Sequence, residues 1–156
     1  MQLRVIAVGT RMPAWVTEGW QQYAGRMPKT CPLLLLEIPL THRSGAVSTD
    51  VARDQEGEKI LRAIKPGHRV VALEVLGKLG DTDALATRFS KWRGDSNNVD
   101  FVIGGPDGLA PAVLERADEN WSLSPLTLPH GMTRIVVAEQ LYRAWTISQG
   151  HPYHRS

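Results

Sequence analysis

Short apolar runs alternate along this chain with longer stretches that carry the three- and four-residue spacing of an amphipathic helix. The apolar runs predict four strands, at Leu3–Val8, Leu33–Ile38, Arg69–Leu76 and Val99–Ile103. The intervening stretches predict helices over Pro13–Met27, Asp50–Lys65, Asp81–Trp92 and Pro111–Ala117. This regular alternation favours an α/β fold, with a mostly parallel sheet flanked by helices.

Proline and small polar residues mark where the predicted helices begin. Pro13 opens the first helix, and Ser48 or Thr49 caps the second. The second helix is expected to turn Val51 and Ile60 inward, while its many charged side chains form a solvated face.

The last quarter of the chain carries two further patterns. Trp121–Leu128 alternates apolar and polar residues around Pro125, as a short strand would. Thr133–Ser148 is helical and presents two adjoining apolar faces, which implies two packing partners. One is expected to be the sheet. The other is either the same helix in a second subunit or the rest of this domain.

A cluster of basic and aromatic residues, His151, Tyr153, His154 and Arg155, ends the chain. Pro152 argues against a helix here, and no third ligand accompanies the two histidines, so no metal site is expected. On the preceding helix, Arg143 has the spacing for an i, i+4 ion pair with Glu139. That pair would make Arg143 either a structural partner or a site residue.

Length and composition indicate one folded globular domain, residues 1–156. No apolar run approaches the roughly 18 residues of a membrane-spanning helix, and no secretory leader precedes Leu3. Cys31 is the one cysteine, which fits a reducing compartment. We therefore expect a cytoplasmic protein.

The net charge of +2 and the pI near 8.9 permit RNA binding without establishing it. The distribution of charge is more informative, since several basic residues fall within the final quarter: His130, Arg134, Arg143, His151, His154 and Arg155. A local basic site is one interpretation, and solvated surface residues are the other.

The loop Gly104–Gly108 follows the fourth strand directly. In parallel sheets ligands bind at the carboxyl ends of strands, so this loop is a candidate binding loop. It lacks both the G-x-G-x-x-G fingerprint and the lysine of a P-loop. A nucleoside cofactor held by backbone groups and a plain tight turn both fit the pattern. Nucleophile-elbow, zinc-helix and Cys-x-x-Cys motifs are also missing from the sequence, which disfavours hydrolases and metalloenzymes.

Five segments in order, LRVIAVGT, GEKIL, VIGGPDGL, WSLSPLTLPH and EQLYRAWTISQGHPYHRS, resemble the ribosomal RNA large-subunit methyltransferase H family. These are small pseudouridine N3-methyltransferases of the SPOUT, or trefoil-knot, class. The departures from the family pattern are small. Asp107 stands where Glu is frequent, and Ser156 ends a tail that is frequently charged at its last residue.

The resemblance implies an α/β fold with a C-terminal trefoil knot, a homodimer, and S-adenosylmethionine bound in the knot. Transferred by motif, the cofactor contacts fall on Leu73, Gly104, Leu123, Ser124, Pro125, Leu126, Thr127 and Leu128. Backbone groups in these loops can hold adenine and ribose without charged side chains.

The implied reaction is methylation of N3 of a pseudouridine in a hairpin loop of large-subunit ribosomal RNA, on the assembled ribosome. Arg143, Tyr153 and His154 are the implied catalytic residues. Two other functions stay open from the sequence. One is a different enzyme with a nucleoside cofactor on an open sheet, and the other is a ribosome-binding module without catalytic activity.

Overall fold

A computed structural model describes residues 1–155 of the chain. Its strands are β1 (Leu3–Val8), β2 (Leu33–Ile38), β3 (Arg69–Leu79), β4 (Val99–Ile103) and β5 (Glu119–Ser122). Its helices are α1 (Ala14–Ala24), α2 (Thr49–Ala63), α3 (Thr82–Gly94), α4 (Pro111–Arg116) and α5 (His130–Ser148), followed by the 3-10 helix η1 (Pro152–Arg155). No helix within residues 1–155 is both long enough and apolar enough to cross a bilayer.

All five strands form one sheet in the order β2-β1-β4-β3-β5, and every neighbouring pair is parallel. The predicted α/β fold with a parallel sheet is therefore confirmed. Leu73 of β3 is in register with Ile103 of β4 on one side and with Trp121 of β5 on the other. The carboxyl ends of these three strands consequently meet at one edge of the sheet. The trefoil knot stays a prediction.

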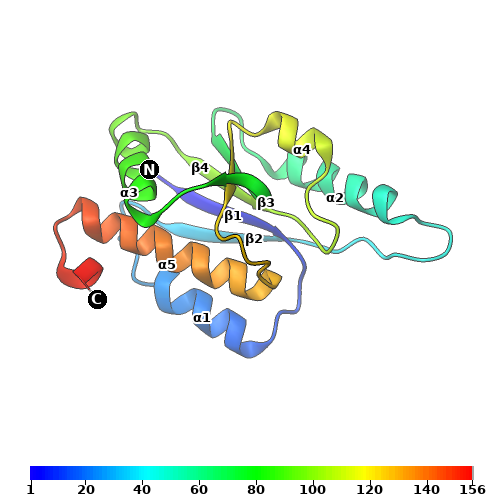
Figure 1. Cartoon of the computed structure of the whole chain (residues 1–156), viewed down its shortest axis with the longest axis horizontal. Helices are drawn as coiled ribbons and strands as arrows, with labels where there is room; N and C mark the ends of the chain where they lie inside the picture. Colours follow the sequence, from blue (N-terminus) through cyan, green and yellow to red (C-terminus); the bar gives the residue numbers. More distant parts are fainter. Residues whose placement is uncertain (156) are drawn as a thin grey trace.

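Helices cover both faces of the sheet (Figure 1). Helices α1, α3 and α5 enclose one apolar core, in which Trp20, Phe89 and Leu141 are buried. Helices α2 and α4 enclose a second core, which contains Ile60 and Val113. The sheet thus lies between two packed layers, as its nearly continuous apolar strands require.

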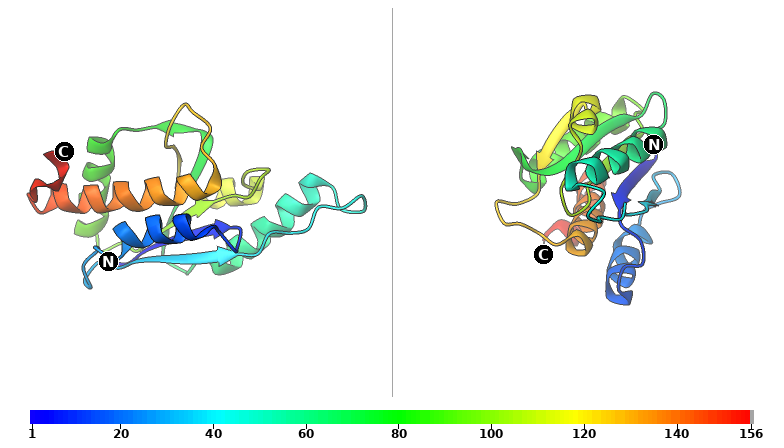
Figure 2. Two further views of the ribbon diagram at one scale, coloured as in Figure 1. Left: turned by 90° about the horizontal axis from the view of Figure 1, so that it is seen from below. Right: turned by 90° about the vertical axis from the view of Figure 1, so that its right-hand side faces the viewer.

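Helix α1 packs closely along α5 (Figures 1 and 2). Two glycines permit the approach, since a Cβ on Gly19 would lie 2.6 Å from Ile135 and one on Gly131 would lie 2.6 Å from Val16. The two apolar faces predicted for α5 are therefore occupied within the chain, one by α1 and the other by the sheet and α3. A second subunit is not needed to explain the apolar pattern of this helix.

Strand β3 runs three residues beyond its predicted end at Leu76. Its pairing with β5 breaks after Leu73 and resumes at Lys78, so that both residues are in register with Trp121. The intervening residues bulge out of the ladder. This bulge matters for function because it opens space at the edge where the three strands end.

The segment Trp121–Leu128 is a strand only as far as Ser122, because β5 spans Glu119–Ser122. The residues after it turn instead. The Ser122 hydroxyl donates to the Ser124 carbonyl at 3.0 Å, and the Ser124 hydroxyl accepts from the Leu126 amide at 2.9 Å. Pro125 has no amide hydrogen to donate to a ladder, which favours this outcome.

Three smaller predictions are wrong. Val51 is 47% exposed, because it lies in the first turn of α2, whereas Ile60 is buried as expected. The nearly continuous apolar run Leu33–Ile38 predicts a buried strand, but β2 is only partly buried, since it is an edge strand and Leu34 remains 44% exposed. A short helix, η1, does form at Pro152, which occupies its first position, where proline is tolerated.

Candidate functional site

A pocket of about 390 Å³ lies at the carboxyl ends of β3, β4 and β5 and is closed by the first turn of α5. Its size is typical of a small-molecule site. Seven of the eight residues predicted to bind a cofactor line it: Leu73, Gly104, Leu123, Ser124, Leu126, Thr127 and Leu128. Pro125 is not among the lining residues. Three separate segments of the chain that contain predicted cofactor contacts therefore converge on one pocket.

The loop Gly104–Gly108 forms one wall of this pocket and owes its shape to its glycines. The Gly108 amide donates to the Gly105 carbonyl at 3.0 Å, and Gly108 has a φ of +77°, which disfavours other residues. A Cβ on Gly104 would lie 2.4 Å from the carbonyl carbon of Gly108. Backbone atoms, and not side chains, therefore face the pocket along this wall.

Eight lining residues lie outside the predicted cofactor contacts and the candidate loop Gly104–Gly108: Glu74, Val75, Leu76, Ile103, Leu109, Ser122, His130 and Thr133. The rule that sites form after strand ends points to the loops that follow β3 and β4. The bulge of β3 itself gives no local signal, because it depends on how β5 pairs with β3.

The pocket holds little charge, since Glu74 and His130 are its ionisable lining side chains and, within residues 1–155, neither Lys nor Arg lines it. Burial lowers the pKa of His130, and the nearby charge of Arg134 lowers it further. A backbone hydrogen bond with Gly105 and the charge of Glu56 offset this shift in part. The imidazole is therefore neutral at neutral pH, and the pocket suits a ligand without phosphate groups.

Arg134, one of the basic residues of the final quarter, has a structural role. Its guanidinium is buried and donates to Glu37 at 2.7 Å and to the Gly9 carbonyl at 2.8 Å. These bonds fix the start of α5 against the ends of β1 and β2. Arg134 is therefore not part of a basic surface.

The three predicted catalytic residues gather at the other end of α5. Arg143 pairs with Glu139 at 2.6 Å, and its guanidinium lies over the Tyr153 ring, 5.0 Å from the ring centroid. The Tyr153 hydroxyl donates to the same Glu139 carboxylate at 3.2 Å. The ion pair expected from the sequence is thus present, and it joins Arg143 to the tail.

The chemical states of these side chains follow from their contacts. The hydrogen bond to Glu139 raises the pKa of Arg143, so the guanidinium stays charged. Burial and the Glu139 carboxylate raise the pKa of Tyr153, so its phenol stays protonated at neutral pH. The buried Nδ1 of His154 has no hydrogen-bond partner among residues 1–155. Together with Arg143, Gln140 and Thr82, His154 borders a second hollow.

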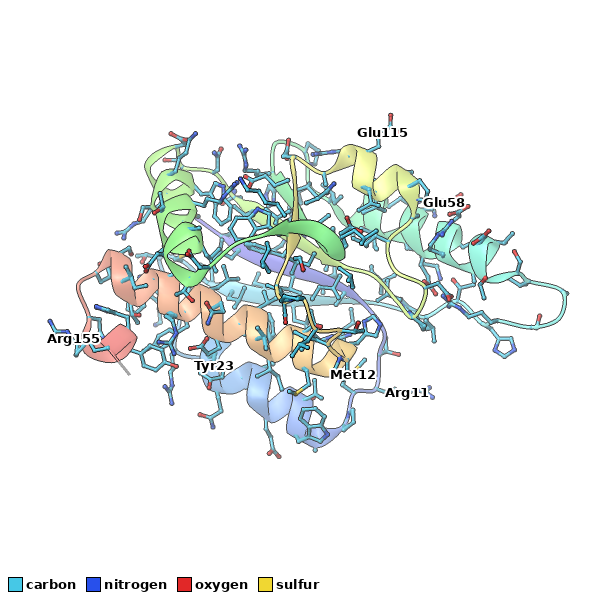
Figure 3. All side chains as sticks on the ribbon, viewed as in Figure 1. Arg11, Met12, Tyr23, Glu58, Glu115 and Arg155 are labelled. Atoms are coloured by element: carbon cyan, nitrogen blue, oxygen red, sulfur yellow. The ribbon has the colours of Figure 1, made fainter. Side chains whose placement is uncertain are left out.

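Within one chain this cluster is remote from the pocket. Thr133 lines the pocket and Arg143 follows it by ten residues on the same helix, a span of about 15 Å at the usual helical rise. Figure 3 shows Arg155, which directly follows His154, at one end of the α1 and α5 layer and Met12 near the other. The structure therefore does not bring Arg143, Tyr153 and His154 to the predicted cofactor residues of their own chain.

Comparison with known proteins adds to this geometry. A family model described as "Predicted SPOUT methyltransferase" matches residues 1–154. Proteins named "Ribosomal RNA large subunit methyltransferase H" from Pseudomonas putida, Azotobacter vinelandii and Pseudomonas aeruginosa are each 55% identical to the chain. Each alignment covers 99% of this chain and 100% of the relative.

Among solved structures, a probable methylase family protein from Haemophilus influenzae matches with a TM-score of 0.59. The match covers 97% of this chain and 69% of the other at 13% identity, so it shows the fold alone. The sequence relatives carry more weight because they match over their whole length. The chain belongs to the SPOUT methyltransferases, in the ribosomal RNA large subunit methyltransferase H family.

Proposed function

We propose that this protein uses S-adenosylmethionine to methylate N3 of a pseudouridine in a hairpin loop of large-subunit ribosomal RNA, with the assembled ribosome as substrate. Family membership supports methyl transfer, and the name of the relatives supports the RNA. The observation that carries the proposal is the pocket at the ends of β3, β4 and β5, walled by backbone loops. We place the protein in the cytoplasm, where ribosomes are, and expect no metal and no membrane.

The residues around the pocket fit S-adenosylmethionine better than a phosphate-bearing cofactor. The pocket lacks lysine and arginine side chains, its His130 is neutral at neutral pH, and Glu74 is its one acidic side chain. A cationic ligand without phosphates meets no positive charge there. When bound, S-adenosylmethionine supplies an electrophilic methyl group.

The cluster at the end of α5 has the groups that the RNA base requires. N3 of pseudouridine must lose its imide proton, and negative charge then develops on the neighbouring carbonyl oxygens. Arg143, which stays charged, would stabilise these oxygens. Tyr153, which stays protonated, would orient the base as a hydrogen-bond donor, and the unpartnered His154 Nδ1 would take up the proton.

The two groups of residues work together in a homodimer in which one subunit contributes the pocket and the other contributes its tail. The separation of about 15 Å along α5 supports this arrangement. Exposed apolar side chains at the pocket also support it, since Leu76 is 90% exposed, Leu126 73% and Val75 59%. A second copy would cover them. We also infer the trefoil knot, which family membership supports.

Mass spectrometry of ribosomal RNA tests the function directly. Cells without this protein are expected to lack one methyl group on a pseudouridine of the large-subunit RNA. Purified protein with S-adenosylmethionine should restore that group on isolated ribosomes. Unchanged RNA would contradict the proposal, and binding to ribosomes without methylation would indicate a module that lacks catalytic activity.

Acidic pH should weaken the binding of S-adenosylmethionine through His130. The pKa of this residue is low, so affinity is full at neutral pH and falls as pH drops through that pKa and the imidazole becomes charged. Repulsion of ~1 kcal/mol would lower affinity about fivefold. Calorimetry over a series of pH values from 7.5 downward measures this loss. The loss of affinity at acidic pH should be smaller for the product S-adenosylhomocysteine, which lacks the sulfonium charge. His130→Gln should remove this difference in pH dependence between the two ligands.

A further inference from the structure

Helix α2 carries a buried carboxylate that the proposed reaction does not use. Glu56, which directly precedes the GEKIL segment of the sequence, has a side chain only 2% exposed. Its Oε1 accepts from the Thr41 amide at 2.9 Å and pairs with the guanidinium of Arg43. A buried charge of this kind is costly unless it is paired, so Arg43 supplies a compensating positive charge.

Arg43 also reaches the glycine loop of the pocket. Its Nε and Nη2 donate to the same oxygen of Asp107, at 3.0 and 2.8 Å, while its Nη1 donates to the Thr41 carbonyl at 2.7 Å. One side chain therefore joins the connection after β2, helix α2 and the Gly104–Gly108 loop. This connection extends at one end of the molecule (Figure 2), so the contacts with Arg43 tie it back to the body of the protein.

The network touches the pocket wall from behind. A Cβ on Gly105 would lie 2.9 Å from Oε2 of Glu56, so the loop backbone rests directly on the carboxylate. Gly105 lines the pocket, and its carbonyl accepts the turn hydrogen bond from the Gly108 amide. Any displacement of Glu56 or Asp107 therefore moves backbone atoms that face the ligand.

We propose that Arg43 is a positioning residue for the methyl-donor pocket, holding the Gly104–Gly108 loop in place through Glu56 and Asp107. The inference rests on the proposed function, because it takes the pocket to be the S-adenosylmethionine site. Without the guanidinium, the buried Glu56 and the nearby Asp107 are two uncompensated carboxylates. Their repulsion and the hydration of Glu56 displace the loop outward.

Arg43→Met tests this role, because methionine keeps much of the apolar stem and removes the charge. We expect the Kd for S-adenosylmethionine, measured by calorimetry, and the KM for it on ribosomes to rise about tenfold or more. The kcat at saturating cofactor should stay within about twofold, because Arg43 contacts Thr41, Glu56 and Asp107 behind the loop and is not among the proposed catalytic residues. Arg43→Lys should be intermediate, since one ammonium does not reproduce the planar fork.

Arg62→Met is the matched control. It also removes one arginine charge, but Arg62 lies on α2, is 77% exposed and, among residues 1–155, pairs with Glu58 in the i, i+4 geometry. Its Kd and KM should equal those of the unaltered protein. Asp107→Asn is the second variant. The Asp107 side chain is 32% exposed, and its replacement leaves the buried charge of Glu56 paired with Arg43. Asp107→Asn should also raise the Kd for S-adenosylmethionine.

Two results would overturn the inference while leaving the proposed function intact. One is an unchanged Kd in both folded variants, with folding checked by circular dichroism. The other is a fall in kcat without a change in KM. If the unaltered protein itself binds no S-adenosylmethionine, the proposed function fails first, and the two failures are distinguishable by that single titration.

Discussion

Replacing Arg143 with alanine is expected to slow methyl transfer to ribosomes by about 10²- to 10³-fold, the range seen when a charge-stabilising donor is removed. The guanidinium stays charged, because its pKa is raised by Glu139, and it is held against Tyr153. Its loss removes positive charge from the carbonyl oxygens of the base as N3 loses its proton. Binding of S-adenosylmethionine should be unchanged, because Arg143 does not line the pocket of its own chain and its proposed role is toward the RNA base.

Single-turnover rates on isolated ribosomes, with calorimetry of cofactor binding alongside, separate these two effects. Arg62→Ala is the control, since Arg62 also pairs with a glutamate four residues before it, at 3.2 Å, but on the exposed side of α2. It should react at the normal rate. If a folded Arg143→Ala variant also reacted at the normal rate, the Arg143–Glu139 pair would have a structural role only.

The strands and helices could be predicted from local pattern, because the side chains on each face of an element are mostly buried or mostly exposed. Val99–Ile103 is apolar except for Asp100, and it lies at the centre of the sheet, as that composition indicates. The end of the strand near Trp121 could not be predicted from local pattern. It depends on the bulge in β3 and on the turn around Ser124, and both arise from pairing between distant segments.

The site shows the same division. The rule that ligands bind at the ends of parallel strands, together with the family resemblance, located the pocket loops. His130 and Glu74 line the pocket because of tertiary packing, so no local spacing pointed to them. The link from Arg43 to Asp107 spans 64 residues, and sequence periodicity carries no information at that distance.

The distance between the pocket and the Arg143 cluster is the result that most affects the mechanism. The loop through Leu128 and the residue Arg143 both lie in the final quarter of the sequence, and the family resemblance led us to expect one subunit to supply the cofactor and the other its tail. Helix α5 is continuous from His130 to Ser148 and places Thr133 of the pocket about 15 Å from Arg143. A chain acting alone would have the proposed cofactor pocket without the proposed catalytic residues beside it.

Two inactive variants are therefore expected to restore activity when they share a dimer. Arg143→Ala keeps the pocket and lacks the guanidinium. Gly104→Ala keeps the Arg143 cluster and lacks a working pocket, because the added Cβ would lie 2.4 Å from the Gly108 carbonyl carbon. In a mixed dimer, the pocket of the first variant faces the intact tail of the second, so one of the two sites is complete.

Co-expression of the two chains in equal amounts yields a population that contains the mixed dimer. Methyl transfer to ribosomes measures the activity of this whole population. Random pairing of equal amounts makes half of the dimers mixed, and each mixed dimer has one complete site of two, so the population should show about one quarter of normal activity. Each variant alone should be nearly inactive. If each chain instead used its own Arg143, no chain in the mixture would hold both a pocket and a guanidinium, and the mixed dimer would be as inactive as its parents. Activity near one quarter therefore requires a site built from two subunits, and its loss would place the whole reaction within one chain.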